Sequence, residues 1–274
     1  MFKDRVWWVT GASSGIGLAL ATELAARGAS LILSGRNEAA LNEALARLGG
    51  NGLVLPFEAS DFGRMAEIAE RAWSFAAERA GGIYGLINNA GITQRSLAVD
   101  TSFDVYRRII DVDLLGPIAL TQSLLPRLVE KGEGQVVAIS SVAGICGVPM
   151  RSAYSAAKHG LIGYHDALRA ETAHLGLKVL VVAPGSVRTN VSKNALTGTG
   201  AMRGVSDSVI DNGMDPALAA TRILAAVRDG VRELILAEGA EADSAQLRRS
   251  NPDLLFDRMA NLVASGYAKL FDNK

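Results

Sequence analysis

The 274-residue sequence has a single cysteine, Cys146, and so cannot form a disulfide within the chain. Because disulfides are rare in reducing compartments, we expect a cytoplasmic protein. The sequence also lacks a charge imbalance, since Lys plus Arg and Asp plus Glu both number 28. A formal net charge of zero gives no reason to expect nucleic acid or an anionic membrane surface as a general partner.

Long apolar runs are missing as well. None approaches the 18 residues of a membrane span, and a strand-like run already begins at Val6, so we expect neither a transmembrane helix nor a signal peptide. The three histidines, His159, His165 and His174, show no metal-ligand spacing with acidic residues or the cysteine. A metal site is therefore not expected.

Short β-branched runs alternate with longer helix-periodic segments along most of the chain. This alternation predicts an α/β fold with a doubly wound parallel sheet, the Rossmann fold, in a single domain over 1–274 with its core at 5–237. The expected strands are 5–10, 30–34, 52–57, 84–88, 134–140, 178–183 and 232–237. The expected helices are 15–27, 38–48, 62–79, 103–131, 153–175 and 216–229.

Two segments depart from this rhythm. The stretch at about 190–214 is rich in Gly, Ser and Thr and follows a strand, where ligands bind in such folds. It predicts a flexible substrate lid, with an ordinary surface excursion as the alternative. The tail at about 251–271 has an apolar stripe at helical spacing, which predicts a helix packed on this subunit or on a partner. The stripe consists of Leu255, Met259, Leu262, Val263 and Leu270.

A glycine-rich turn, TGASSGIG at 10–17, joins the first strand to the first helix. Glycines there allow a tight turn and a close approach to a pyrophosphate, which the helix N-terminus then binds. The expected cofactor-binding residues of this turn are Gly11, Ser13, Ser14, Gly15, Ile16 and Gly17. The same letters match the G-x-S-x-G nucleophile elbow of hydrolases, but no histidine follows late enough in the chain to complete that triad.

The end of the second strand indicates which dinucleotide binds. An NAD site usually has an acidic residue there, whereas this strand ends Leu33-Ser34-Gly35-Arg36. Arginine suits a 2′-phosphate, so we expect NADP(H). Glu38 is the alternative, as an acceptor for a 2′-hydroxyl.

Tyr154 and Lys158 lie four residues apart in an expected helix, on one face and about one turn from each other. Ser141 follows an expected strand at its carboxyl end, where ligands bind. Reduction of a carbonyl needs an acid for the substrate oxygen, which a tyrosine supplies, and a donor that stabilises the developing negative charge, which a serine supplies. We expect Ser141, Tyr154 and Lys158 to form a catalytic set.

Taken in order, these motifs resemble the classical short-chain dehydrogenase/reductase family, and more narrowly its hydroxysteroid-dehydrogenase-like reductases. The resemblance covers about 5–237. It rests on TGASSGIG, on Asn88-Asn89-Ala90-Gly91, on Ser141 thirteen residues before Tyr154, on Tyr-x-x-x-Lys, and on Pro184-Gly185.

The resemblance implies further site residues. Tyr154 and Lys158 would also contact the cofactor. The other residues expected to bind it are Glu58, Ala59, Asn88, Ala90, Gly91, Pro184, Gly185, Val187 and Thr189. One departure stands out, because Asp113 occupies a position where the family usually has an asparagine that relays protons to the active-site lysine. We count Asp113 among the catalytic positions and expect activity to survive this change.

The expected function is that of an NADP(H)-dependent oxidoreductase interconverting a ketone or aldehyde and an alcohol on a small apolar substrate. The alternative is a catalytically silent dinucleotide-binding or sensor protein of the same fold. Isomerisation or dehydration is not excluded by the motifs. The resemblance implies a homodimer or homotetramer.

Overall fold

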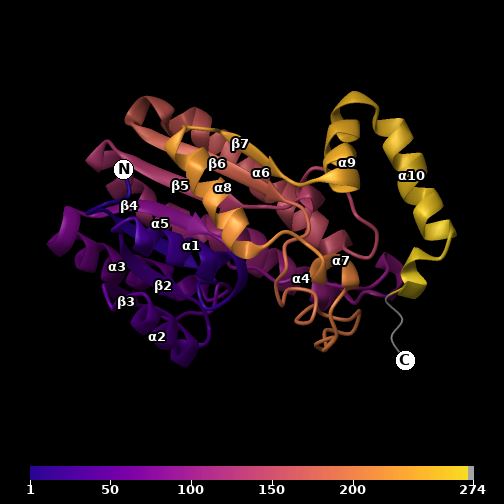
Figure 1. Cartoon of the computed structure of the whole chain (residues 1–274), viewed down its shortest axis with the longest axis horizontal. Helices are drawn as coiled ribbons and strands as arrows, with labels where there is room; N and C mark the ends of the chain where they lie inside the picture. The colour runs from indigo at the N-terminus through magenta and orange to yellow at the C-terminus, as the bar shows by residue number, and fades with distance from the viewer. Residues whose placement is uncertain (271–274) are drawn as a thin grey trace.

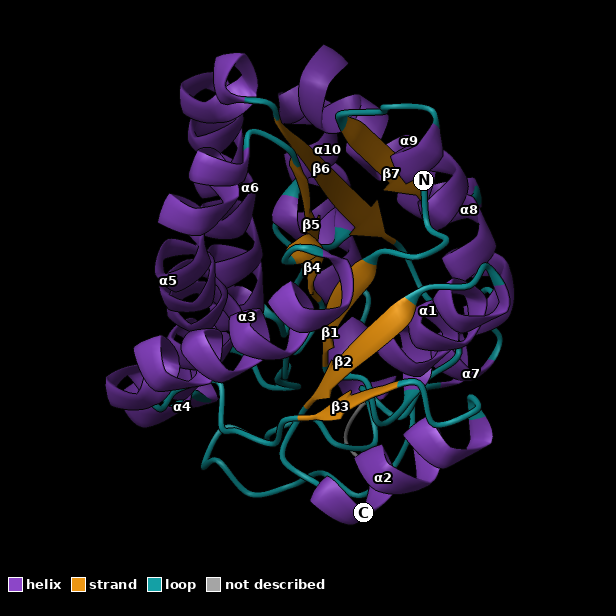
Figure 2. Ribbon diagram, turned by 90° about the vertical axis from the view of Figure 1, so that its left-hand side faces the viewer, coloured by secondary structure: helices purple, strands orange, loops and turns teal. Residues whose placement is uncertain are grey.

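The computed structural model describes residues 1–270. Within them, seven strands form one fully parallel sheet in the order β3-β2-β1-β4-β5-β6-β7 (Figure 2). The strands are β1 (Val6–Thr10), β2 (Ser30–Ser34), β3 (Gly52–Val54), β4 (Ile83–Asn88), β5 (Gly134–Ile139), β6 (Leu177–Pro184) and β7 (Glu233–Leu236). The doubly wound α/β fold predicted from the sequence is confirmed.

Helices cover both faces of the sheet, as Figure 1 shows. One face carries α1 (Gly15–Ala26), α2 (Glu38–Arg47) and α8 (Pro216–Arg228). The other carries α3 (Met65–Ala80), α5 (Gly116–Lys131) and α6 (Ser152–Thr172). The central strand β1 is apolar throughout because both of its faces are buried. Trp7 and Val9 pack against the first set of helices, while Val6 and Trp8 pack against the second.

The strand order places a reversal between β1 and β4. The chain winds outward from β1 to β3, then crosses back to β4 and winds the other way. At such a switch point the loops after the two strands diverge and leave a crevice at the carboxyl edge of the sheet. The fold therefore positions a site beside the turn after Thr10 and the turn after Asn88.

The expected long helix over 103–131 is confirmed as a continuous segment with a change of pitch. It consists of α4 (Phe103–Ile110), a π-helical turn (Asp111–Leu115) and α5. A π-helical turn inserts an extra residue and frequently marks a functional site. Here it turns Asp113 into the protein interior, where its exposed fraction is 0%.

This helix also corrects the expectation that no segment is long and apolar enough for a membrane span. The segment Phe103–Lys131 meets that test by length and composition, with 44% of its apolar window buried. A core helix of a soluble protein meets the same test, so one such helix is weak evidence. Its apolar residues Leu120, Leu124 and Leu128 pack in the second core layer.

The C-terminal part contains two helices, α9 (Gly239–Ser250) and α10 (Pro252–Ala264), and a short turn (Tyr267–Leu270). The tail helix predicted from its stripe corresponds to α10, where Leu255 is buried and Met259 packs nearby. The sequence did not predict α9, because only Ala245 of that polar helix is buried. The predicted tail also included residue 271, which lies outside the described residues.

Candidate active site

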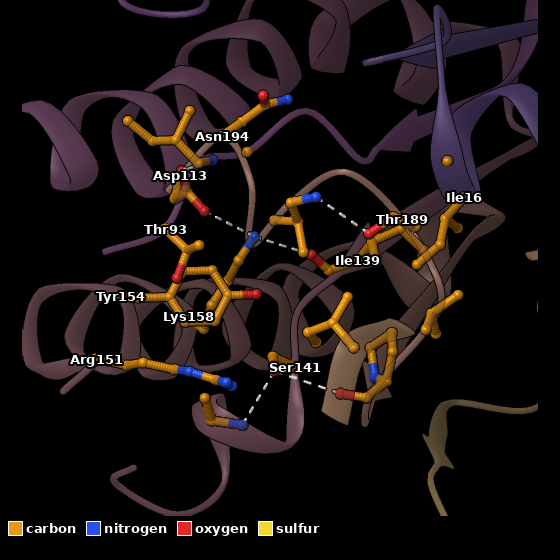
Figure 3. A pocket seen from close by; sticks show the side chains of 18 of the residues that line it. Ile16, Thr93, Asp113, Ile139, Ser141, Arg151, Tyr154, Lys158, Thr189 and Asn194 are labelled. Carbon is orange, nitrogen blue, oxygen red and sulfur yellow. Dashed lines mark hydrogen bonds and ion pairs between the residues drawn. The ribbon is translucent and has the colours of Figure 1, made fainter. Parts of the chain in front are cut away.

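A cavity of about 960 Å³ lies at the carboxyl edge of the sheet. Its lining includes Ser141, Tyr154, Lys158 and Asp113, together with most of the glycine-rich turn. Figure 3 shows these side chains converging from different elements. The structure thus places the sequence-predicted catalytic residues around one space.

The glycine-rich turn has the conformation that its composition predicts. Gly11 and Gly15 have φ of 65° and 56°, values that glycine adopts without steric cost. At Gly17 a Cβ would lie 2.3 Å from the Gly11 carbonyl oxygen. Gly17 does not line the cavity, and its role is the close packing of α1 on the turn.

The turn after β4 is bonded directly to this glycine-rich turn. The Thr10 hydroxyl accepts hydrogen bonds from the backbone N–H groups of Asn89 and Ala90, each at 3.0 Å. The Asn89 side chain donates to the Thr10 carbonyl at 2.9 Å. These bonds hold Ala90 and Gly91 at the cavity wall.

Asn88 requires a correction. Expected as a cofactor contact, it is 2% exposed and does not line the cavity. Its side-chain amide donates instead to the Thr121 hydroxyl of α5 at 2.9 Å. Because side chains alternate along a strand, the last residue of β4 points into the helical layer, and Asn89 reaches the site in its place.

At the end of β2 the structure shows no carboxylate on the strand itself. Arg36 follows Gly35, and its side chain is 62% exposed. Its guanidinium lies 3.8 Å from Glu58, which follows β3. A Cβ at Gly35 would lie 3.9 Å from the Ser13 hydroxyl, so Ser13 also borders this corner. An exposed arginine and a hydroxyl at this point fit a phosphate group.

Ser141 begins the loop after β5. Its hydroxyl oxygen accepts a hydrogen bond from the Ala143 N–H at 3.1 Å and donates to the Pro184 carbonyl at 3.3 Å (Figure 3). These two contacts fix the side chain at the cavity wall. The 3.3 Å bond is long, so the hydroxyl proton can turn to a better acceptor that enters the cavity.

Lys158 lies under Tyr154 on α6, as their four-residue spacing predicts. Its Nζ atom is 5.5 Å from the centroid of the Tyr154 ring. The ammonium donates to the Ile139 carbonyl at 3.2 Å and lies 3.1 Å from Asp113 Oδ2. Lys158 is 4% exposed, so its charge acts in a low-dielectric region.

Asp113 is the second member of this buried ion pair. Its Oδ1 atom accepts a hydrogen bond from the Ile92 N–H at 2.8 Å. Burial raises the pKa of the Asp113 carboxyl, against the opposing effect of Lys158. Burial is the largest single effect on the pKa of Lys158 and lowers it, but the Asp113 charge, Tyr154 and the hydrogen bond to Asp113 together raise the pKa above its ordinary value. The pair holds Lys158 in its ammonium form.

Comparison with known proteins decides the family. The model of the family described as short chain dehydrogenase matches residues 5–200. This chain belongs to the short-chain dehydrogenase family. It is 39% identical over 268 residues to Dehydrogenase/reductase SDR family member 7B of Danio rerio, a match covering 94% of this chain and 85% of the relative.

Solved short-chain dehydrogenases share the fold. One from Streptomyces avermitilis has 30% identity and a TM-score of 0.77, covering 96% of this chain and 97% of the other. One from Sphingobium yanoikuyae, in complex with NADPH, has 26% identity and a TM-score of 0.75 over 92% and 95%. One from Burkholderia phymatum, in complex with NAD, has 21% identity and a TM-score of 0.80 over 92% and 95%. Both dinucleotides therefore occur among proteins of this fold.

In this short-chain dehydrogenase the loop after β6 carries Pro184, Gly185, Val187 and Thr189, all of which line the cavity. The loop is held from α9, a contact that the sequence did not predict. The Glu241 carboxylate accepts hydrogen bonds from the Ser186 N–H at 2.7 Å and the Ser186 hydroxyl at 2.8 Å. The C-terminal helices are thereby tied to the loop after β6 at the cavity wall.

The segment predicted as a lid lies over the other side of the cavity. It contains α7 (Ser208–Asp211), and Asn194, Leu196 and Ile210 line the cavity from it. Asp207 anchors it, because its side chain is 2% exposed and accepts from Arg95 Nε at 2.7 Å. Arg203 pairs with the same carboxylate. The segment lines the cavity in this structure, and its mobility and its role as a lid stay predictions.

The remaining predicted cofactor residues, Ser14, Ile16 and Ala59, also line the cavity. The sequence reasoning missed three arginines of the cavity wall: Arg95, Arg108 and Arg151. No motif marks them, and they come from the loop after β4, from α4 and from the residue before α6. Only the fold brings them to one space.

Proposed function

We propose that this chain is an NADP(H)-dependent oxidoreductase that interconverts a ketone or aldehyde and an alcohol on a small, largely apolar substrate. The observation that carries the proposal is the buried Lys158 ammonium, 5.5 Å from the Tyr154 ring and facing the same cavity as Ser141. A tyrosine beside a fixed positive charge is suited to exchange a proton with the substrate oxygen.

The roles follow from the contacts. Tyr154 gives a proton to the carbonyl oxygen in reduction and takes it from the hydroxyl in oxidation. Ser141 donates a hydrogen bond to the same oxygen and stabilises the charge that develops there. Asp113 and Ile139 hold the Lys158 ammonium in place. When bound, the nicotinamide supplies or accepts the hydride.

The residues present fit a dinucleotide. The glycine-rich turn leaves the N-terminus of α1 open to the cavity, which suits a pyrophosphate. Arg36 and Ser13 border the corner where a 2′-phosphate would lie, and this favours NADP over NAD. Two acidic residues could instead accept from the 2′-hydroxyl of NAD. They are Glu58, which lies beside Arg36, and Glu38, which lies on α2.

The catalytic proposal is tested with Tyr154→Phe. We expect reduction of a panel of aryl and alkyl ketones with NADPH by the wild-type protein, and a loss of at least about 100-fold in the variant. NADPH binding should stay within about threefold. Retained turnover in Tyr154→Phe would contradict the role of Tyr154. Absence of turnover in the wild type, with NADPH bound, would favour the silent binding protein, for which the Asp113–Lys158 pair is the supporting observation.

The cofactor proposal is tested by calorimetric binding of NADPH and NADH. We expect Arg36→Ala to weaken NADPH binding about 10-fold or more and to leave NADH unchanged. Arg47→Ala is a matched control, because its side chain on α2 is also 62% exposed. Equal binding of the two cofactors by the wild type would contradict the assignment of Arg36.

A homodimer or homotetramer and a cytoplasmic location also stay predictions. Size-exclusion chromatography with light scattering tests the first, and cell fractionation tests the second. A small-molecule substrate is the partner that the cavity supports.

A further inference from the structure

Arg151 is a charged side chain in the cavity that the proposed mechanism does not use. It precedes α6, three residues before Tyr154, and lines the cavity. Figure 3 shows its side chain running past Tyr154 with the guanidinium directed toward the Ser141 side of the space. A substrate whose carbonyl lies at Tyr154 and Ser141 would therefore come within reach of Arg151.

Among the described residues, the Arg151 guanidinium has no acidic partner, and its buried Nε atom has no hydrogen-bond acceptor. Across residues 1–270, no carboxylate forms an ion pair with it, in contrast to Arg95 and Arg203, which share Asp207. Buried polar atoms in native proteins nearly always have a partner. An unsatisfied charged donor facing a cavity therefore indicates a ligand that supplies the acceptor.

The backbone before Arg151 holds the residue in this orientation. Met150 has φ of 63°, a left-handed conformation that is uncommon for a side chain other than glycine or asparagine. The Met150 carbonyl accepts a hydrogen bond from the Ser96 N–H at 3.2 Å, and the Arg151 carbonyl accepts from the Ser155 N–H at 2.7 Å. Strain of this kind persists where neighbouring structure enforces it, and it clusters at ligand sites.

The neighbouring charges leave this part of the cavity positive. Burial, and then the Arg151 charge, lower the pKa of Arg95 to about 10, against the opposing effect of Asp207. The guanidinium groups of Arg95 and Arg151 therefore repel each other electrostatically. Asp207 is engaged by Arg95 and Arg203, so its carboxylate does not neutralise Arg151. An anion entering beside Arg151 would relieve this repulsion.

We propose that Arg151 binds an oxyanion group, a carboxylate or a phosphate, carried by the carbonyl substrate. The inference rests on the proposed function, because it orients the substrate relative to Tyr154 and Ser141. The wall also carries large apolar side chains, among them Leu196, Met202, Met259 and Leu262. The substrate class is accordingly an amphipathic ketone with an apolar body and one anionic end. A planar guanidinium matches carboxylate and phosphate geometry through paired hydrogen bonds.

The test uses two pairs of ketones, each consisting of an anion and a neutral counterpart with the same phenyl ketone body. The carboxylate pair is 4-oxo-4-phenylbutanoate and its methyl ester, and the phosphate pair is 2-oxo-2-phenylethyl phosphate and 2-hydroxyacetophenone. Binding to the NADP+-loaded protein is measured by calorimetry, and reduction is followed with NADPH. We expect at least one anion to bind and react about 10- to 100-fold better than its neutral partner. The pair that shows the difference identifies the oxyanion.

Arg151→Met should remove this preference and leave the neutral ketones within about threefold of wild type. Arg151→Lys keeps the positive charge but lacks the planar guanidinium, so it should keep part of the preference for anionic ketones. Arg107→Met is the control, because Arg107 on α4 is 68% exposed, pairs with Asp104 and does not line the cavity. It should leave all four probes unchanged. Circular dichroism of each variant shows whether the fold is retained.

The outcomes separate the two proposals. If neutral ketones are reduced and neither anion has an advantage, the Arg151 inference is wrong and the proposed function stands. An equal loss for anionic and neutral probes in Arg151→Met would also overturn the inference. If an anion binds through Arg151 and no probe is reduced, the anion site stands and the proposed function is wrong.

Discussion

The Lys158 ammonium contacts two oxygen atoms, one from the backbone and one from an acidic side chain. One is the Ile139 carbonyl of β5, and the other is the Asp113 carboxylate of the π-helical turn. A Cβ on Gly91 would lie 2.8 Å from Asp113 Oδ2 and 3.3 Å from Lys158 Nζ. A side chain at this position of the turn after β4 would therefore require the Asp113 carboxylate to shift.

We expect Asp113→Asn to lower the free energy of unfolding by about 3 kcal/mol, because one partner of a buried ion pair is lost. The amide oxygen can still accept from the Ile92 N–H. The pKa of Lys158 falls, because the carboxylate that raises it is gone. Turnover should change by less than about tenfold, since Tyr154, Lys158 and Ser141 remain. Urea denaturation and NADPH-dependent ketone reduction measure the two effects.

Asp111→Asn provides the comparison on the same π-helical turn. Asp111 is only partly buried, so its substitution should leave both stability and turnover near wild type. A rise in turnover of orders of magnitude in Asp113→Asn would mean that the native carboxylate impairs the proton relay. We expect the chain to be active with Asp113 at the position where the family usually has asparagine. That result would contradict this expectation.

At the residue scale, sequence reasoning found the parts of the site that depend on spacing along one element. Tyr154 and Lys158 share a helical face, and Ser141 follows a strand, so local periodicity predicts where they lie. It could not find Arg151, because its orientation depends on the left-handed backbone at Met150. It misplaced Asn88, since the outcome depends on which face of β4 meets α5.

Among the elements, the segment over the cavity has features that its composition does not predict. The composition predicts a flexible substrate lid, and the structure adds a short helix and a buried ion-pair cluster around Asp207. The backbone N–H of Asp207 also donates a hydrogen bond to the Ser192 hydroxyl at 3.1 Å. Asp207 thus joins the segment to the loop after β4 through its carboxylate, and joins the two ends of the segment through its backbone N–H.

We expect Asp207→Ala to open this segment. Two buried guanidinium groups, those of Arg95 and Arg203, lose their acceptor. The loss destabilises the folded conformation of this segment by about 3 kcal/mol or more, because the least stable nearby element opens first. The KM for a ketone substrate should rise about tenfold or more, while NADPH affinity stays within about threefold. Limited proteolysis should cut the chain within 192–214 faster than in the wild type.

Asp211→Ala is the control for the lid. Asp211 lies in the same segment but is exposed, and it accepts only from the Ser206 hydroxyl among the hydrogen bonds described for it. It should leave proteolysis and KM nearly unchanged. Equal proteolysis of Asp207→Ala and wild type would show that the buried pair does not hold the segment.

The strands and the long helices were predictable, because each has a regular apolar period. The boundaries of β1, β2 and β5 agree with the expected ones within a residue or so. The helix α9 was not predictable, since it is fixed by a polar contact, Glu241 to Ser186, rather than by an apolar stripe. Such a contact joins residues 55 positions apart, beyond the reach of local patterns.

At the scale of the whole molecule, one histidine couples folding to pH. His165 is 0% exposed, and its Nδ1 lies 2.8 Å from the Leu161 carbonyl, while Nε2 has no partner. Burial lowers its pKa to about 4, against the opposing hydrogen bond to Leu161. A protonated ring would bury a second N–H without an acceptor, so the folded protein keeps the imidazole neutral.

The unfolded chain takes up this proton near pH 6.5, whereas the folded chain does not until about pH 4. We therefore expect stability to decrease as the pH falls from 6.5 to 4, by about 3 kcal/mol from this residue. The variant His165→Phe should lose this part of the pH dependence, measured by urea denaturation at pH 7, 5.5 and 4.5. His174→Gln, on an exposed position, should retain it. The same slope in all three proteins would contradict the assignment to His165.

The C-terminal helices contribute no strand, yet they form part of the cavity wall through Met259 and Leu262. Because Glu241 joins α9 to the loop after β6, the docking of these helices and the position of that loop depend on each other. Substitutions on α9 and α10 can therefore change which molecules enter without disturbing the sheet. The shape of the cavity can therefore be altered from these two helices while the strands that carry the glycine-rich turn and Ser141 stay as they are.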